Sequence, residues 1–464
     1  MNLELKDSRY IEGHNSYSNN IYFCNVVDKL SQDIKSKKVE FFSLGGQNNQ
    51  LDEDLIWYQI DSIKHFSRTQ IIDKATFFTS HYIGFYSTVV NEKTVNIIIE
   101  PRFGDGIFNY LLSYAYGIYL PKGTSSSYSD KSGSLWLIAL MWKATLEKAM
   151  TKSQIPKEYQ KQSKNLDTFK GQLNISKHIQ HNLFDKSRFY CDYRKLTMDT
   201  AINQTIRHTY KLLEKKGYGD LLKDIAEYDQ MLQSFGVQSK TVSPNDIKKI
   251  RYSKLNIYYK KVMELSSLII KNQSKSSNHL SHSNDSFSYF LDIAELWENY
   301  LLKVLQKNLP QYYIYSPNEN GGISLFEDGS REIRPDIIIE KDAKTVAVLD
   351  AKYKWYKQIG KNGNSDYSVS RDDLYQMTTY LYHYGKENLN IVGLFISPIE
   401  QSIEAPKVLK NNLKHKIKVV NLDIEQFKKP YNTEGVPTDF SIDKIKSEEK
   451  NFIKNIEGIL NDPI

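Results

Sequence analysis

The stretch RPDIIIEKDAKTVAVLDAKY, residues 334–353, decides the fold expected for the C-terminal half of the chain. Two apolar runs flank the polar sequence KDAK at residues 341–344, which is the pattern of a β-hairpin. A hairpin centred on Ala343 pairs residues that lie equally far from it, so Asp336 faces Asp350. Side chains paired in this way have Cβ atoms about 4.5–5.5 Å apart.

Asp350 and Lys352 lie two residues apart in the second strand, so both side chains point to the same face of the sheet. Their neighbours are apolar, and a charge buried there is costly unless it is paired or bound to a metal. Two facing carboxylates repel each other unless a cation lies between them. Carboxylate oxygens favour a hard cation, so Mg²⁺ is the expected cofactor, with Mn²⁺ as an alternative. The competing interpretation is a structural ion pair between Asp350 and Lys352.

A cation at this hairpin suits metal-assisted hydrolysis of a phosphodiester. The ion lowers the pKa of a bound water and polarises the phosphoryl oxygen. Lys352 beside it can stabilise charge on a phosphate or orient a water. Asp336, Asp350 and Lys352 are therefore the predicted catalytic residues, and the two acids are the predicted metal ligands.

Two predicted helices bring further candidates to this site. Glu298 lies on the helix expected over residues 287–309 and is a third candidate catalytic residue and metal ligand. Glu295, three residues earlier, is its rival. Gln376 and Tyr380 are four residues apart on a second helix, so they share a face and can hydrogen-bond the cleft or a DNA backbone. The alternative for Glu298 is a solvent-exposed glutamate without a role in the site. The alternative for Gln376 and Tyr380 is a surface glutamine beside a core tyrosine.

The elements around the hairpin indicate an α/β fold, α+β overall, with a mixed sheet flanked by helices. Besides the hairpin, the C-terminal half contains three expected strands and two expected helices, namely strands 322–328, 390–397 and 418–424 and helices 287–309 and 371–385. The N-terminal half contains two expected strands joined at Asn91 and Glu92, then three helices, namely strands 81–90 and 93–101 and helices 106–120, 135–150 and 199–216.

Shifts in composition predict the domain boundaries. Residues 271–288 are rich in Ser and Asn without apolar periodicity, so they are expected to form a linker. We expect four further regions, namely an N-terminal region of unassigned role, a central region, a region that contains the predicted hydrolytic site and a charged helical tail, at residues 1–80, 81–270, 289–430 and 431–464 respectively.

The composition is that of a soluble globular protein, with 40% hydrophobic and 25% charged residues among 464. This excludes collagen, a coiled coil and wholesale disorder. No apolar run reaches the roughly 18 residues of a membrane helix, and the first ten residues contain no signal-peptide core. A cytoplasmic protein without a membrane partner is expected. Two cysteines cannot form a disulfide framework or a four-cysteine zinc site.

The net charge of +7 is unevenly distributed along the chain. Residues 151–280 contain 24 Lys and Arg against 12 Asp and Glu. Such a basic segment fits contact with a polyanion such as nucleic acid, and it equally fits a solvated lysine-rich surface.

Several motifs occur together in the order typical of one family. Asp336, then DAK at 350–352, then QMTTY at 376–380 resembles the PD-(D/E)xK nuclease pattern with the Gln-xxx-Tyr helix of its RecB-like branch. The chain is similar more narrowly to McrC, the nuclease subunit of McrBC-type restriction systems, and to LlaJI-like subunits. The motifs that carry this resemblance are YIGFYSTVVNEKTVNIIIEPRFG at 82–104, FKGQLNISKHIQHNLFDKSRFYCDYRKLTMDTAINQTI at 169–206, and LWENYL at 296–301.

The resemblance implies an Mg²⁺-dependent endodeoxyribonuclease that cuts double-stranded DNA containing modified cytosine. It implies a separate AAA+ partner, McrB, that uses GTP or ATP, recognises the modification and translocates, while this chain stimulates the partner and cleaves. Asp336, Asp350 and Lys352 would then be catalytic and Glu298 the helix acid, and residues 81–270 would form the partner-docking region. The alternatives are a stand-alone repair or recombination nuclease and a non-cutting adaptor that activates an NTPase.

The remaining motifs are weaker. Residues 360–365, GKNGNS, lack the Lys–Ser/Thr ending of a phosphate-binding loop, so NTP hydrolysis is assigned to another chain. His178, His181 and Cys191 could be taken for a zinc site, but they lack a fourth ligand nearby. Cys24 and Cys191 are expected to be plain buried thiols. Arg102 precedes an expected helix and is a candidate for a partner interface.

Overall fold

The computed structural model describes most of the chain, in segments separated by short gaps. The described residues are 2–6, 10–12, 17–36, 38–42, 55–63, 72–116, 133–276, 288–317, 321–353, 357–359, 365–367, 369–385, 390–399, 407–410, 414–424, 427 and 442–461. The glycine-containing segment at 360–364 and most of the expected linker at 271–288 lie outside these ranges. None of the helices in these ranges combines the length and apolar composition that a bilayer-spanning segment requires.

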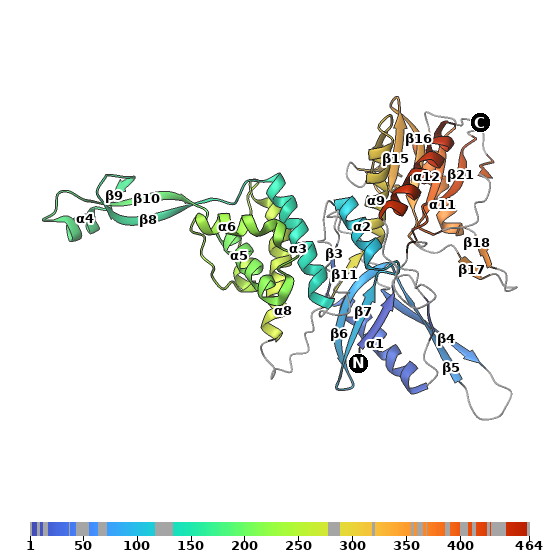
Figure 1. The fold of residues 1–464 in the computed structure, drawn as a ribbon, viewed down its shortest axis with the longest axis horizontal. Coiled ribbons are helices and arrows are strands. Elements are labelled where there is room, and N and C mark those ends of the chain that lie inside the picture. Colours follow the sequence, from blue (N-terminus) through green and yellow to red (C-terminus); the bar gives the residue numbers. More distant parts are fainter. Residues whose placement is uncertain are drawn as a thin grey trace. The chain divides into compact units, whose positions relative to one another are not determined.

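The chain forms two compact units, and their boundaries differ from the expected ones. Unit 1 combines Met1–Leu120 with Ser283–Ile464, and unit 2 is the intervening Pro121–His282. The predicted central region 81–270 is therefore wrong as a single domain, because its first forty residues belong with the C-terminal half. Figure 1 shows the elements coloured along the chain.

The cause is a strand, β11 (Ser288–Asp292), that returns the chain to the N-terminal sheet after unit 2. The sequence pattern places these residues at the start of a helix, but all five are buried in a sheet. β11 pairs antiparallel with β6 (Tyr82–Val90) and parallel with β3 (Val39–Phe42). The strand order is β1-β7-β6-β11-β3, where β1 is Asn2–Lys6 and β7 is Lys93–Glu100.

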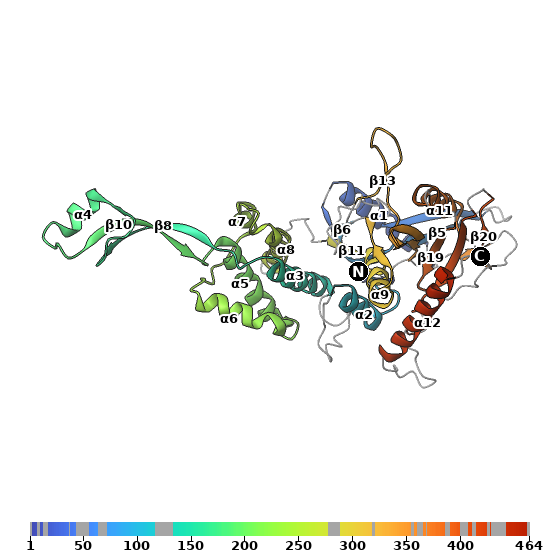
Figure 2. The same cartoon turned by 90° about the horizontal axis from the view of Figure 1, so that it is seen from above.

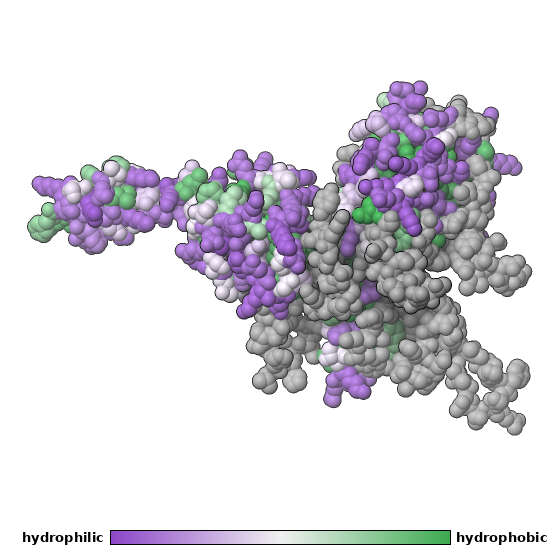
Figure 3. Space-filling view, in the orientation of Figure 1, coloured by the Kyte–Doolittle hydropathy of each residue, from purple (hydrophilic) through white to green (hydrophobic). Residues whose placement is uncertain are grey.

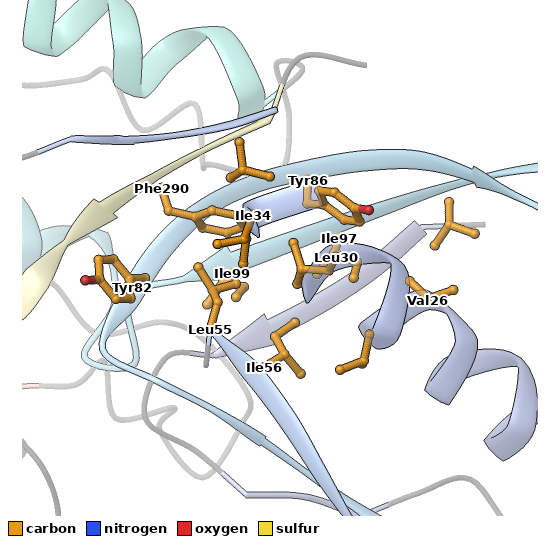
Figure 4. Close-up of a cluster of buried hydrophobic side chains, with 13 residues drawn as sticks. Val26, Leu30, Ile34, Leu55, Ile56, Tyr82, Tyr86, Ile97, Ile99 and Phe290 are labelled. Carbon is orange, nitrogen blue, oxygen red and sulfur yellow. The ribbon is translucent and has the colours of Figure 1, made fainter. Parts of the chain in front are cut away.

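The N-terminal sheet has an apolar core that follows from strand and helix periodicity. Val95, Ile97 and Ile99 alternate along β7 and are fully buried, which confirms the predicted strand pair. Helix α1 (Tyr17–Lys35) places Val26, Leu30 and other side chains against them, and Phe290 of β11 joins the same cluster (Figure 4). Residues 1–80 thus contribute to this core. They also form a smaller sheet of order β2-β5-β4, whose strands are Tyr10–Glu12, Ile72–Thr79 and Ile56–Ile63.

The C-terminal half contains the predicted mixed sheet, with six strands in the order β12-β15-β16-β19-β21-β20. Neighbours in the middle, β16 with β19 and β19 with β21, are parallel, and the outer pairs are antiparallel. The strands are β12 (Tyr313–Tyr315), β15 (Ile337–Lys341), β16 (Lys344–Ala351), β19 (Val392–Ser397), β20 (Lys407–Val408) and β21 (Lys416–Asn421). The strand expected over 322–328 is reduced to β13 (Ile323–Ser324), which pairs with β14 (Glu332–Ile333). A further pair is formed by β17 (Lys357–Ile359) and β18 (Ser365–Tyr367).

The hairpin register agrees with the prediction next to the site but not at the turn. Ile337 faces Leu349, and the same spacing places Asp336, which directly precedes β15, opposite Asp350. The turn itself consists of Asp342 and Ala343, both with positive φ, so the strands leave it one residue out of this register. A bulge between Ile339 and Glu340 restores the alignment.

Three helices accompany this sheet: α9 (Ile293–Asn308), α11 (Arg371–Tyr384) and α12 (Ile442–Asn461). The first two confirm the predicted helices, except that α9 begins after β11. The tail beyond residue 430 was expected to be a charged helix, but α12 buries one face in unit 1. Glu449 of α12 accepts hydrogen bonds from Tyr110 of α2 (Asp105–Tyr116) and from Tyr300 of α9, at 2.5 and 2.7 Å.

Among its described residues, unit 2 contains five α-helices besides α4 (Ile175–Asn182). They are α3 (Gly133–Lys152), α5 (Ala201–Leu213), α6 (Ala226–Ser234), α7 (Pro244–Lys248) and α8 (Lys260–Ser276). Trp142 of α3 donates a hydrogen bond to Ser266 of α8 at 2.8 Å. Arg207 of α5 and Asp229 of α6 form a buried ion pair at 2.9 Å. These polar links are added to an apolar interior and fix the packing of the helices.

A β-ribbon extends from these helices, and we call residues 157–199 the arm (Figures 1 and 2). β8 (Glu158–Leu166) and β10 (Phe189–Thr197) pair antiparallel, β9 (Gln172–Leu173) adds a short third strand, and α4 (Ile175–Asn182) follows β9. At the root of the arm, the side-chain amide of Asn203 donates to Pro156 O and Met198 O, at 2.9 and 2.7 Å. Asn203 therefore ties both strands of the ribbon to α5.

The junction of β11 with the N-terminal sheet predicts a severe effect of substitution at Gly84. A Cβ added there would lie 2.2 Å from Tyr289 O, so Gly84→Ala must displace the β11 backbone. We expect a loss of about 1–3 kcal/mol in the free energy of unfolding, measured by thermal or chemical denaturation of the full chain. Gly458→Ala in α12 is the control, because a Cβ there meets nothing within 4 Å. Equal melting temperatures for the two variants would contradict this role of β11.

Candidate active site

The carboxyl end of β16 carries the central pair of the site. The Lys352 ammonium lies 2.7 Å from Asp350 Oδ2 and 3.1 Å from Asp373 Oδ1. It also donates a hydrogen bond to Gln376 Oε1 at 3.2 Å. Asp350 and Asp373 are buried, and the Lys352 side chain is 13% exposed. The ammonium is therefore held by three side chains while it keeps some access to solvent.

Asp373 is a site residue that the sequence analysis missed. It is the third residue of α11 and belongs to the helix cap, because its backbone N–H donates to Ser370 Oγ at 3.2 Å. Ser370 Oγ in turn donates to Asp373 Oδ2 at 2.6 Å, which leaves Oδ1 directed at Lys352. An acid at this position is fully explained by helix capping, so the sequence alone gave no signal of its contact with Lys352.

Asp336 lies beside this pair. Its Oδ2 accepts a hydrogen bond from the backbone N–H of Ala351 at 2.6 Å. Burial raises the pKa of Asp336 well above its ordinary value, and the nearby carboxylates of Glu298 and Asp350 raise it further. The structure therefore brings the predicted residues Asp336, Asp350 and Lys352 together.

Glu298 of α9 also reaches this group. Burial raises the pKa of Glu298 to about 8, with contributions from Asp292, Glu295 and Asp350, while Lys352 lowers it. Its rival Glu295 is buried as well. Burial raises the pKa of Tyr116, and the charge of Glu295 is the second largest cause of that rise. Of the two glutamates, Glu298 is the one whose charge acts on Asp336, so the structure favours it as the helix acid.

Tyr380 and Gln376 occupy the same face of α11, as the spacing predicts, but they act on different groups. Gln376 contacts the Lys352 ammonium. The buried Tyr380 hydroxyl donates to Arg334 O at 3.3 Å, and Tyr384, one turn later, donates to Ile333 O at 3.1 Å. The two tyrosines therefore hold the backbone that leads into Asp336.

The donor set fits a hard divalent cation that is completed by water and substrate. Among the described residues, no three His, Cys, Asp or Glu side chains form a ready-made metal cage. Mg²⁺ does not require one, since it is commonly bound by one or two carboxylates and keeps several waters or phosphate oxygens. Burial raises the pKa of both Asp336 and Glu298, and the charges of neighbouring carboxylates raise it further. A divalent cation would relieve that repulsion between the carboxylates.

The weaker candidates have structural roles. His178 Nδ1 contacts the side-chain amide of Asn182 at 3.0 Å and the backbone N–H of Tyr190 at 3.3 Å. His181 stacks on the Tyr190 ring, and Cys191 is a buried free thiol within β10. Each of these three residues therefore has a structural role within the arm. Arg102 was a candidate for a partner interface, but it is buried inside unit 1.

Similarity to known proteins gives the family of the chain. A family profile described as "McrBC 5-methylcytosine restriction system component" matches residues 78–396, which is more than half of the chain. The chain belongs to this family. No curated protein matches this McrBC-family chain.

Two solved structures resemble the McrBC-family chain. One is a refined half-complex from a tetradecameric assembly of Thermococcus gammatolerans McrB AAA+ hexamers with bound McrC, with 17% identity, a TM-score of 0.53, and coverage of 99% of this chain and 100% of that one. The other is the cryo-EM structure of the Thermococcus gammatolerans McrBC complex, with 15% identity, a TM-score of 0.34, and coverage of 68% and 89%. The first likeness confirms the fold, a mixed sheet flanked by helices.

The crowding of acids predicts that the site costs stability. At neutral pH an acid with a raised pKa either retains a proton or holds an unfavourable charge in the folded state, whereas it ionises freely in the unfolded chain. We therefore expect Asp336→Asn, which can still accept from Ala351, to stabilise the metal-free protein by about 1 kcal/mol or more, or about 2–4 °C in melting temperature. The exposed Asp372→Asn is the control, with no change expected. A lower melting temperature for Asp336→Asn would show that its charge stabilises the fold.

Proposed function

We propose that this chain is the Mg²⁺-dependent DNA endonuclease subunit of a two-component, NTP-dependent restriction complex. The observation that carries the proposal is the Lys352 ammonium at 2.7 Å from Asp350, with Asp336 and Glu298 beside them at the end of β16. A buried ion pair alone would not require two further acids with raised pKa values. The family description adds a substrate class, DNA that contains 5-methylcytosine.

Asp336, Asp350 and Glu298 would hold the ion. When bound, Mg²⁺ supplies a water of lowered pKa and a polarised phosphoryl oxygen. Lys352 would place its positive charge beside a bound phosphate and would stabilise the negative charge that develops during hydrolysis. Asp373 and Gln376 restrict the rotation of the Lys352 side chain, so its charge is already oriented before the substrate arrives.

The arm supports the partner in this proposal. Helix α4 and its C-cap residue Leu183 expose three apolar side chains spaced four residues apart, Ile175, Ile179 and Leu183, each more than half exposed. Phe184 follows them and is 96% exposed. Figure 3 shows hydrophobic residues at the end of the arm. Such a patch indicates a protein contact. The McrC relative is bound to AAA+ hexamers, so we assign the patch to an AAA+ NTPase, which uses GTP or ATP and selects the modified DNA.

Substitution of Asp350 tests the nuclease assignment. In the full chain, assembled with the AAA+ protein encoded next to it, Asp350→Asn should reduce Mg²⁺-dependent cleavage of methylated DNA at least about a hundredfold, because a charge that holds the ion is lost. Stimulation of the partner's NTPase should remain. Mg²⁺ should also raise the melting temperature of the unsubstituted chain but not of the variant.

Matched controls separate this result from loss of fold. Asp372→Asn and Lys344→Ala alter exposed charges on α11 and β16 and should cut normally, whereas Lys352→Ala should not. Undiminished cutting by Asp350→Asn would remove the site assignment. Efficient cutting by the chain without a partner would favour a stand-alone nuclease, and NTPase stimulation by a chain that never cuts would favour an adaptor.

The arm patch yields a separate prediction. Ile179→Asp and Phe184→Ser should lower NTPase stimulation at least about tenfold, since each removes apolar area from a docking surface. The Mg²⁺-induced rise in melting temperature should persist, because these residues lie outside unit 1. Leu255→Ser is the control, since Leu255 is 83% exposed in unit 2 but lies outside the arm. Normal stimulation by both arm variants would exclude the patch as the docking surface.

A further inference from the structure

A tight turn between β7 and α2 carries an arginine into the interior of unit 1. The turn spans Pro101 to Gly104, and the Gly104 N–H donates to Pro101 O at 3.0 Å. Gly104 has φ +82°, a backbone conformation that favours glycine, so a glycine at this position allows the tight turn. The turn presents Arg102, which is only 3% exposed.

The Arg102 guanidinium lies against the residue that follows Lys352. Its Cζ atom is 4.2 Å from the centre of the Tyr353 ring and 4.6 Å from the centre of the Phe103 ring. The two rings meet edge to face at 5.7 Å. One guanidinium nitrogen, Nη2, donates a hydrogen bond to Tyr353 O. Arg102 thus contacts both the side chain and the backbone of Tyr353.

This contact completes a set of three backbone hydrogen bonds at consecutive residues. The Ala351 N–H donates to Asp336 Oδ2, and the Lys352 N–H donates to Ile396 O of β19 at 2.9 Å. Tyr353 O accepts from Arg102. The backbone of Lys352 is therefore held from before, at and after its own position, by three different parts of unit 1.

We propose that Arg102 is a positioning residue for the proposed nuclease site, an inference that rests on the proposed function. By fixing Tyr353 O, it fixes the direction in which the Lys352 side chain leaves the backbone. Displacement of a catalytic group by about 1 Å can cost about a hundredfold in rate. The turn after β7 therefore acts as a brace for the catalytic strand.

An arginine suits this position better than a lysine. A planar guanidinium can lie against aromatic faces and donate within its plane at the same time, whereas a lysine ammonium is a compact charge without a flat face. Arg102→Lys should therefore restore only part of what Arg102→Ala loses, and free guanidinium ion, below denaturing concentrations, should restore part of the function of Arg102→Ala.

The test compares Arg102→Ala and Arg102→Lys with the exposed Arg251→Gln. The first measurement is amide hydrogen exchange of the full chain without partner or metal. In Arg102→Ala, the amides of Ala351 and Lys352 should exchange faster, while those of β21 keep their protection. The second measurement is cleavage by the complex, in which kcat should fall about ten- to a hundredfold while KM for DNA and NTPase stimulation stay within about twofold.

The outcomes are distinct. Unchanged exchange at Ala351 and Lys352 would overturn the claim that Arg102 holds the backbone around Lys352, whatever the cleavage rate. Faster exchange with normal kcat, in a complex that Asp350→Asn inactivates, would overturn the positioning role. Equal losses of cleavage, NTPase stimulation and melting temperature would indicate a merely structural arginine and also overturn it. A complex that cuts no DNA even without substitution would contradict the proposed function, and the positioning role with it. The hydrogen-exchange result would still decide whether Arg102 holds the backbone at Tyr353.

Discussion

The ion pair between Lys352 and Asp350 is the interaction around which the candidate active site is arranged. Both charges lie at the carboxyl end of β16, directly after the buried apolar residues Ala347, Val348 and Leu349. Charges in such a place destabilise a fold unless they are paired and hydrogen-bonded. Asp373 and Gln376 provide the remaining partners of the lysine, which requires α11 to start next to the end of β16. The capping of α11 by Ser370 is therefore part of the site as well as part of the helix.

The sequence predicts correctly that Asp336 lies opposite Asp350, but the symmetric hairpin behind that prediction leaves out a bulge. Symmetry about Ala343 places Asp336 opposite Asp350, and the observed pairing of Ile337 with Leu349 has that register. The tight turn at Asp342 and Ala343 would, without the bulge, pair Ile337 with Val348. At the register shift between Ile339 and Glu340, β16 contributes one extra residue, Val346, and no local feature of the sequence marks this bulge.

What could be predicted from the sequence is what local periodicity determines. The hairpin, α11 and the apolar stripe of α9 were predictable because each element has a clear period and clear ends. β11 was not, because SYFLD is compatible with a buried strand or a helix start, and its partners in β3 and β6 lie some two hundred residues or more away. The same limit applies to Asp373 and Arg102. A capping acid and an arginine in a turn have ordinary local explanations, and only tertiary contacts with Lys352 and Tyr353 reveal another role.

The charges at the site also explain why a cation is needed for the proposed chemistry. Asp350 and Asp373 contact the ammonium of Lys352, and the charges of Asp336 and Glu298 act on the same group of residues. Burial, followed by the charges of Glu298 and Asp350, raises the pKa of Asp336, so a negative charge is already unfavourable there. A phosphodiester that approached these groups alone would add a further negative charge to a buried acidic site. A divalent ion bound by the carboxylates would reverse the local sign of the charge, so the same acids that would repel DNA in its absence would become the means of attracting a phosphate. The site is thus expected to engage its substrate only together with the ion, which links DNA engagement to catalytic competence.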